Sequence, residues 1–316
     1  MQVFTLTLQQ MALLFTFIAI GYIVAKLKVV PDNAGAVLSK LENNVFTPAS
    51  ILGTFITGFT VAKLSSAWQF VTVCIVVVLI SIPVAMLIAK LTTKDSYVRK
   101  IYTYGLAFSN FGFMGNAVVQ SVYGDDVYMN YLIFVIPLWV AIYAWGVPAL
   151  LMPDTVGQGI KARLKNIFNP MLIATFLGMI IGITALPVPA FITGAIKTLG
   201  GCMSPIAMLL TGMAIAKINL KESFTDVPIY VISFARLIVI PFAFMLPLYF
   251  IPIPFEVKLC AICAVSMPLG LSTIVVPGAY GLDTKKASGM ALISHLLSCI
   301  TNPIVFMIFD KIFNSL

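Results

Sequence analysis

Ten long apolar stretches, separated by short polar breaks, run through the chain. Each reaches the roughly 20 residues that an α-helix needs to cross the hydrocarbon core of a bilayer. Backbone N–H and C=O groups inside lipid have no water to hydrogen-bond with. A spanning segment therefore forms a helix, in which these groups hydrogen-bond to one another. We therefore expect an all-α polytopic membrane protein with ten transmembrane helices. The expected spans are 5–26, 35–58, 66–91, 98–122, 127–152, 168–187, 190–216, 227–250, 256–281 and 287–310.

The composition agrees with a membrane-spanning chain. Only 9% of the 316 residues are charged, whereas a soluble domain has about a quarter. A transmembrane β-barrel is excluded, because its strands would alternate apolar and polar residues over segments of about ten residues. The apolar runs of this chain are continuous instead.

The lysines and arginines indicate how the spans are oriented. Most of the 19 lie in the loops that follow odd-numbered spans. Loops rich in these residues stay in the cytoplasm, so we expect both termini outside, in a multi-pass protein of the inner or plasma membrane. The net charge of +8 is then a topology signal, and no nucleic-acid partner is expected.

Several unusual residues recur at a spacing of 157 positions. Each repeat then contains five spans. Because five is an odd number, the second repeat enters the membrane from the opposite side and is inverted relative to the first, as in many secondary transporters. We expect a first repeat over 1–152, a cytoplasmic linker over 153–167 and an inverted second repeat over 168–316. The matching positions include Gly21 and Gly178, Pro48 and Pro205, Ser109 and Ser266, and Tyr123-Gly124 and Tyr280-Gly281.

The fourth and ninth spans carry matching interruptions, Ser-Asn-Phe-Gly-Phe-Met-Gly-Asn and Ser-Met-Pro-Leu-Gly-Leu-Ser-Thr. Glycine weakens a helix by about 1 kcal/mol and proline by about 3 kcal/mol. Paired interruptions near the membrane midplane indicate a transport site, where half-helix N-termini attract anions. Glycines that only allow close helix packing are the alternative. The expected substrate-binding residues are Ser109, Asn110, Gly112, Gly115, Asn116, Pro268, Gly270, Ser272, Thr273 and Arg236.

Charged side chains inside spans need a partner or a wet cavity. Arg236 lies near mid-bilayer and either holds carbonyl groups of a helix break or meets a substrate carboxylate. Glu42 and His295 are candidates for proton or ion coupling, although a lone histidine more often only donates a hydrogen bond. Lys40 and Lys197 lie near helix starts, where their amines can reach the interface. The spans thus contain three cationic side chains and one carboxylate, Glu42, and this excess of positive charge favours an anionic substrate.

The interrupted segments also resemble a known family. They are similar to the signatures of the auxin efflux carrier family in two places. The first is Ser109–Gly115 followed by Tyr123-Gly124, and the second is Met267-Pro268 followed by Tyr280–Asp283. The resemblance implies the fold of the bile acid/sodium symporter-like superfamily, with helices 4 and 9 broken and crossing. It implies a scaffold of helices 1, 2, 6 and 7 and a transport domain of helices 3–5 and 8–10.

The resemblance also suggests auxins, or bacterial dicarboxylates such as malate and malonate, as the substrate class. The chain lacks a long central hydrophilic loop and so resembles a short bacterial member. Asn116-Ala117 stands where relatives often carry proline shortly after the helix 4 glycine, so we expect glycine alone to break span 4.

The function expected from these patterns is secondary active transport of a small organic anion by alternating access. We expect no catalytic residues, no metal and no cofactor beyond a coupling proton or sodium ion. The scaffold helices could also form the interface of a homodimer. A ligand-binding sensor without transport is one alternative. An intramembrane serine protease that pairs Ser272 with His295 is another. The substrate, the coupling ion and the transport direction are left open.

Overall fold

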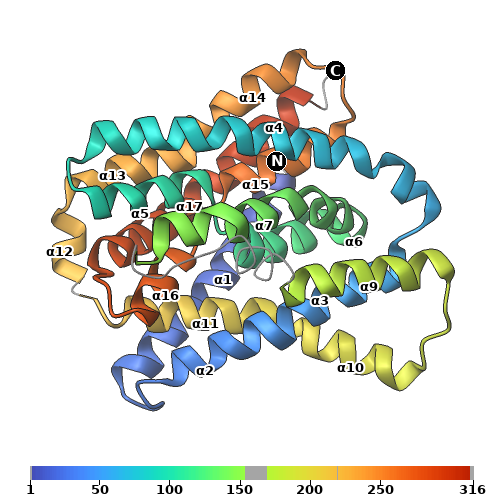
Figure 1. Ribbon diagram of the computed structural model, residues 1–316, viewed down its shortest axis with the longest axis horizontal. Helices are drawn as coiled ribbons and strands as arrows, with labels where there is room; N and C mark the ends of the chain where they lie inside the picture. Colours follow the sequence, from blue (N-terminus) through green and yellow to red (C-terminus); the bar gives the residue numbers. More distant parts are fainter. Residues whose placement is uncertain (1, 154–168, 219, 314–316) are drawn as a thin grey trace.

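The computed structural model describes residues 2–153, 169–218 and 220–313, and these residues are predominantly helical (Figure 1). The expected linker, apart from Pro153, lies outside the described residues. In the first half the helical segments are α1 (Gln2–Lys26), α2 (Ala34–Leu41), η1 (Glu42–Phe46), α3 (Thr47–Gly58), α4 (Val61–Thr92), α5 (Ser96–Ala107), η2 (Phe111–Gly115), α6 (Asn116–Phe134), α7 (Ile136–Ala141) and η3 (Ile142–Leu151).

The second half repeats this pattern and adds α12, a short helix that the sequence did not predict. The segments labelled η are π-helical turns, which the apolar pattern also did not reveal. The elements are α9 (Pro170–Thr184), α10 (Ala190–Gly201), α11 (Met203–Ile215), α12 (Leu220–Thr225), α13 (Val227–Phe234), η4 (Ala235–Val239), α14 (Ile240–Phe250), α15 (Phe255–Ser266), α16 (Ser272–Ala279) and α17 (Lys285–Phe313).

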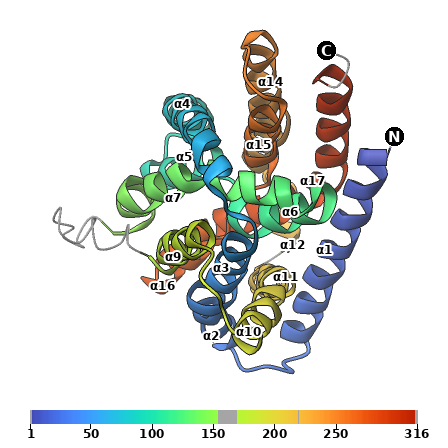
Figure 2. The same cartoon turned by 90° about the vertical axis from the view of Figure 1, so that its right-hand side faces the viewer.

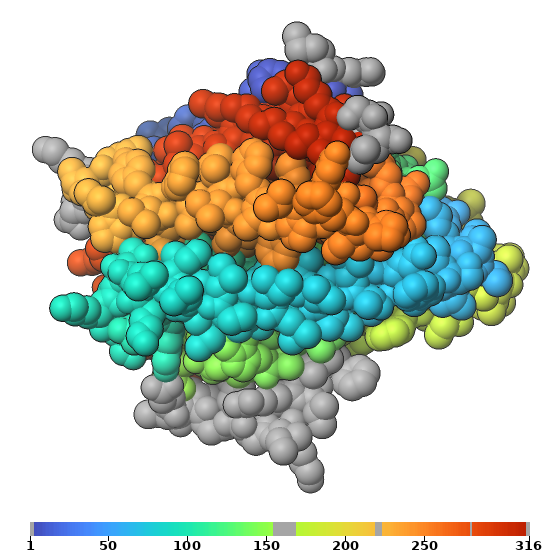
Figure 3. Space-filling model, turned by 90° about the horizontal axis from the view of Figure 1, so that it is seen from above, coloured from blue at the N-terminus to red at the C-terminus, as the bar shows by residue number. Residues whose placement is uncertain are grey.

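Six continuous helical stretches in the described residues are long and apolar enough to cross a membrane. A shorter apolar helix covers Pro170–Thr184. The all-helical membrane class is therefore confirmed, while the count of ten spans stays a prediction. Large apolar side chains are exposed along α4 and α14, for example Leu79 at 65% and Leu246 at 67%. These two helices form adjacent bands on one face (Figure 3), as lipid-facing helices do.

Backbone conformation shows the repeat directly. Among the described residues, φ is positive at Gly124 (82°), Gly281 (70°), Lys28 (54°) and Ala185 (50°). Gly281 follows Gly124, and Ala185 follows Lys28, by the same 157 positions. Two pairs of unusual left-handed turns at one common spacing are a structural signature of duplicated halves.

The helices form two groups. α1 packs against α11 and α17, and α3 packs against α9 and α10. In Figure 2, α2, α3, α9, α10 and α11 lie in the lower part, with α4, α14 and α15 above them. The start of α1 and the end of α17 lie at the same end of the molecule. This arrangement suits termini that share one side of a membrane.

Glycines allow the closest helix contacts in the lower group. A Cβ on Gly21 of α1 would lie 2.2 Å from the carbonyl oxygen of Leu209 in α11. A Cβ on Gly178 of α9 would lie 2.6 Å from Cβ of Phe55 in α3. These glycines are repeat equivalents, so each half uses the same small residue to bring helix pairs together.

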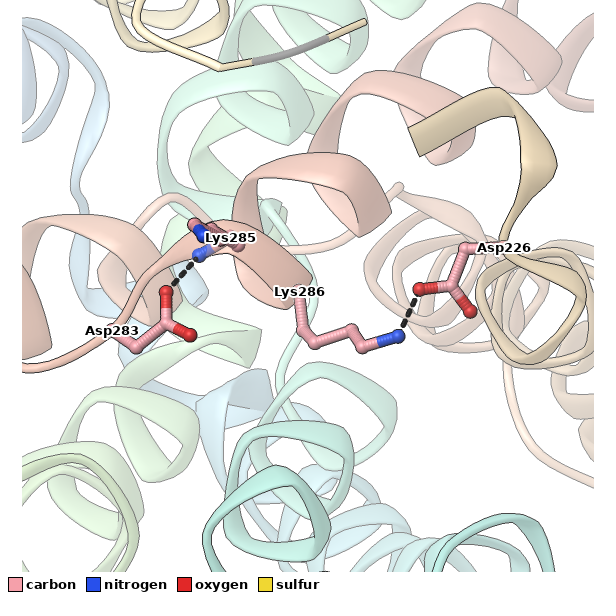
Figure 4. A network of polar contacts seen from close by, with 4 residues as sticks. All are labelled: Asp226, Asp283, Lys285 and Lys286. Carbon is pink, nitrogen blue, oxygen red and sulfur yellow. Dashed lines mark hydrogen bonds and ion pairs between the residues drawn. The ribbon is translucent and has the colours of Figure 1, made fainter. Parts of the chain in front are cut away.

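Polar contacts join the connection between α16 and α17 to neighbouring helices (Figure 4). Lys286 forms an ion pair with Asp226, which precedes α13. The side chain of Asp283 accepts a hydrogen bond from the backbone N–H of Lys285 at 2.9 Å. The hydroxyl of Tyr97 in α5 donates to the carbonyl oxygen of Asp283 at 2.6 Å. Three helix ends are thus held together on the side expected to be cytoplasmic.

Candidate functional site

Two helices are interrupted at the positions that the sequence indicated, and the interruptions cross. α5 ends at Ala107 before η2 begins at Phe111, and α15 ends at Ser266 before α16 begins at Ser272. Ser109 and Leu269 form an isolated antiparallel bridge. The N–H of Asn110 donates to the carbonyl oxygen of Pro268 at 2.7 Å. Each interruption therefore supplies backbone partners to the other.

Residue types at the second interruption suit this close approach. Pro268 has no N–H that would need a partner. A Cβ on Gly270 would lie 3.2 Å from the carbonyl oxygen of Ser109, which is tighter than ordinary packing. The N–H of Leu269 donates to the hydroxyl oxygen of Ser294 at 3.2 Å. The segment is held from α17 as well as from the first interruption.

The expected cause of the first interruption was wrong. The backbone leaves the helix at Phe108–Asn110, ahead of both Gly112 and Gly115, which lie inside η2. Pairing with Pro268 and Leu269, rather than glycine alone, holds the chain out of the helix there. A Cβ on Gly112 would lie 2.6 Å from the ring of Trp139, and one on Gly115 would lie 2.3 Å from the hydroxyl of Tyr131. These two glycines have a packing role, as in the alternative interpretation.

Arg236 ties the two interrupted helices together. Its side chain is 1% exposed and projects from the π-helical turn η4. Its guanidinium donates to the carbonyl oxygens of Leu106 at 2.7 Å, Met267 at 3.1 Å and Ala264 at 3.3 Å. These carbonyls lie at the ends of α5 and α15, where intrahelical partners run out. Of the two expected roles, the geometry displays the one that holds the helix breaks.

Asn110 and His295 form a buried pair beside the crossing. The Asn110 carboxamide nitrogen lies 3.1 Å from Nε2 of His295, and Nδ1 of His295 lies 2.7 Å from the carbonyl oxygen of Ala291. A carbonyl can only accept and an amide nitrogen can only donate. The ring is therefore neutral, with its proton on Nδ1. The pair of His295 with Ser272 that the serine-protease alternative requires is not among these contacts, because both ring nitrogens of His295 face Asn110 and Ala291 instead.

The remaining hydroxyls at the crossing are already engaged. Ser109 donates to the carbonyl oxygen of Ala264 at 2.6 Å, and Thr273 donates to that of Gly270 at 2.8 Å. Both bonds stabilise the non-helical backbone on either side of the bridge. A ligand would have to displace these contacts or bind beside them.

Asn116 and Glu42 keep unpartnered oxygens in buried positions. Glu42 is 0% exposed in η1, where one carboxylate oxygen accepts from Thr47 at 2.9 Å. Its other oxygen, and the carboxamide oxygen of Asn116, have no hydrogen-bond partner among the described residues. Buried polar groups without partners are rare in proteins and call for an explanation.

A cavity of about 940 Å³ opens between α3, α6 and α10. Gln120, one turn beyond Asn116 on α6, lines it and donates to Asp125 at 3.0 Å. Lys197 also lines it, and both Lys197 and Lys40 have exposed side chains. None of the ten residues expected to bind substrate is among the lining residues that the structure describes. Its lining includes Gly58 at the end of α3 and Ala190 at the start of α10, on the side expected to lie outside the cell.

The structure brings nine of the ten expected residues to the crossing or its flanking turns, with Arg236 reaching it from η4. Glu42 lies apart, on η1. Sequence reasoning missed Tyr131, whose hydroxyl donates to the carbonyl oxygen of Phe111 at 3.0 Å, and Ser294. It also missed Asn302, a buried residue whose nitrogen lies 3.8 Å from the sulfur of Met267; its only signal in the sequence was an Asn-Pro pair inside an apolar span.

Comparison with known families decides the class of the protein. The family model described as membrane transport protein matches the chain twice, over residues 6–162 and 152–306. The chain belongs to the auxin efflux carrier family. Two matches, one for each half, agree with the paired turns of the backbone. The family consists of membrane transporters rather than enzymes, so the protein is a membrane transporter. The comparison with curated proteins gives no match.

Proposed function

We propose that the protein is a secondary active transporter that moves a small organic anion, a carboxylate, by alternating access. The substrate binds where the two interrupted segments cross. The bridge between Ser109 and Leu269 is the observation that carries this proposal. It leaves two half-helices starting beside one point in the protein interior, which is the arrangement used by transporters with discontinuous helices.

The charge at the crossing favours an anion. Helix N-termini carry partial positive charge, and both η2 and α16 begin next to the bridge. Arg236 adds a buried guanidinium that contacts the carbonyl oxygen of Met267, next to Pro268 of the crossing. Asn110 supplies a carboxamide whose nitrogen can turn from His295 to a substrate carboxylate.

The arrangement of the helices in two groups supports alternating access. In this proposal α1–α3 and α9–α11 form the scaffold, and the remaining helices form the transport domain of two inverted repeats. The cavity lies between α3 and α10 of the scaffold and α6 of the transport domain. The conformation is then open to the outside, and the contacts of Figure 4 hold the transport domain's inner ends together as it moves.

Counterflow in liposomes tests the proposal. Purified protein is reconstituted with an unlabelled carboxylate inside, and uptake of the labelled carboxylate is followed across a broad panel. We expect saturable counterflow that Asn110→Ala lowers at least tenfold. Absence of both binding and exchange for every carboxylate would remove the proposal.

The alternative of a ligand-binding sensor makes a different prediction in the same experiment. A sensor would show ligand-induced thermal stabilisation of the purified protein without any counterflow. The unpartnered buried oxygens fit either alternative, so exchange across the liposome membrane is the deciding measurement.

A further inference from the structure

One face of α17 carries a line of buried polar side chains. His295, Ser298 and Asn302 are spaced by three and four residues, which places them on one side of a helix. All three are 0% exposed. In a membrane-spanning helix such groups need partners inside the protein, so the partners of each residue indicate its role.

His295 and Ser298 are satisfied within the protein. His295 uses both ring nitrogens, and the hydroxyl of Ser298 donates to the carbonyl oxygen of His295 at 2.7 Å. Asn302 differs from both. Its carboxamide oxygen has no hydrogen-bond partner among the described residues, and its nitrogen points at the sulfur of Met267 at 3.8 Å.

Asn116 shows the same pattern on the opposite segment. Its oxygen also has no partner among the described residues, and its nitrogen points at the sulfur of Met203 at 3.8 Å. The neighbouring Gly115 lies against Met267, since a Cβ there would be 3.4 Å from Cγ of that methionine. Asn302 therefore contacts Met267 itself, while Asn116 contacts Met203 and follows a residue that lies against Met267.

Thioether sulfur is a weak acceptor, so both amide nitrogens keep donor capacity. Methionine side chains are flexible and adapt to different neighbours. Met267 and Met203 can therefore move aside when a polar ligand arrives. The two amides then offer two kinds of contact at once, N–H donors and carbonyl acceptors.

We propose that Asn302 is a substrate-binding residue whose carboxamide oxygen accepts a hydrogen bond from a donor group of the transported anion. The inference rests on the proposed function and narrows its substrate class. A simple carboxylate brings only acceptors, whereas the unpartnered oxygens of Asn302 and Asn116 need donors. The preferred substrate therefore carries a hydroxyl or N–H group close to its carboxylate.

Matched pairs of acids test this preference. Binding of lactate and propionate, and of malate and succinate, is measured calorimetrically on the purified protein. We expect the wild type to bind the hydroxylated member about tenfold more tightly, the effect of about one good hydrogen bond. Asn302→Leu, similar in size but apolar, should reduce the preference below about twofold. Ser298→Ala, which removes a hydroxyl already satisfied within α17, should leave the preference unchanged.

The possible outcomes distinguish a failure of the proposed role of Asn302 from a failure of the proposed transport function. A wild type that neither binds nor exchanges any carboxylate overturns both. A wild type that binds each pair equally, or a preference that survives in Asn302→Leu, overturns only the role of Asn302. Thermal unfolding without ligand gives a second readout. Asn302→Leu should unfold at the wild-type temperature or above, because an unpartnered group is replaced, and a lower temperature would make Asn302 a structural residue.

Discussion

Nη1 of Arg236 lies 2.7 Å from the carbonyl oxygen of Leu106, the next-to-last residue of α5. The same guanidinium reaches Met267 and Ala264 at the end of α15. One side chain from a third helix therefore binds the exposed carbonyl ends of both interrupted helices. A planar group with five donors suits three diverging acceptors better than an ammonium does.

Arg236→Ala should destabilise the protein strongly. The substitution leaves the buried carbonyl groups of Leu106 and Met267 without this donor, at about 1–3 kcal/mol for each, while the carbonyl of Ala264 keeps the hydroxyl of Ser109. We expect a loss of at least about 2 kcal/mol, with Arg236→Lys intermediate, measured by thermal and denaturant unfolding in detergent. Wild-type stability combined with lost anion binding would instead make Arg236 a substrate contact.

Gly212→Ala should separate α1 from α11. A Cβ there would lie 2.0 Å from the carbonyl oxygen of Ile18 and 2.6 Å from the backbone nitrogen of Tyr22, and backbone cannot move aside cheaply. We expect a loss of about 1–3 kcal/mol or more from overpacking. Gly194 of α10 is the matched control, because a Cβ there meets nothing within 4 Å. Gly194→Ala should be neutral or stabilise by up to about 1 kcal/mol.

Thr54→Cys should react with a membrane-impermeant maleimide added outside intact cells. Thr54 lines the cavity of about 940 Å³, and the thiol needs water to ionise. Cys202 and Cys299, the two cysteines that are not fully buried, are first replaced by alanine. Leu79→Cys, on the apolar face of α4, should not react. Labelling of Thr54→Cys only in inside-out vesicles would reverse the proposed orientation.

Glu42→Gln should separate binding from proton coupling. Glutamine keeps an oxygen for the hydroxyl of Thr47, so we expect the unfolding temperature to change little. If Glu42 carries a coupling proton, uptake driven by a pH gradient is lost while exchange of labelled substrate persists. Thr47→Val serves as a control for the local packing. Gradient-driven uptake that survives in Glu42→Gln would exclude this carboxyl group as the proton carrier.

Much of the architecture was predictable because lipid leaves few alternatives. The length of each apolar run fixes a helix, and the pair Tyr123-Gly124 and Tyr280-Gly281 showed the repeat before any backbone angle was known. The interruption in span 9 was predictable because Pro268 and Gly270 cannot extend a stable helix. The sequence could not show that residues 108–110 are held open by a segment far along the chain.

Other parts of the site depend on three-dimensional contacts that carry no local pattern. Whether Arg236 meets carbonyl groups or a substrate depends on which helix ends surround it. The cavity was not predictable, because glycine, serine and threonine residues such as Gly53, Ser50 and Thr54 line much of it and are ordinary in packed helices. Asn302 looked like one polar residue in an apolar span until its oxygen proved to lack a partner.

The bridge between Ser109 and Leu269 also bears on how the chain is made. The N–H of Asn110 finds its acceptor on Pro268, which the ribosome adds long after the first five spans have left it. Until then that backbone lies in lipid without its partner, a costly state. Newly made residues 1–153 should therefore be short-lived when expressed alone. Co-expression of residues 154–316 should restore their lifetime in a pulse-chase experiment.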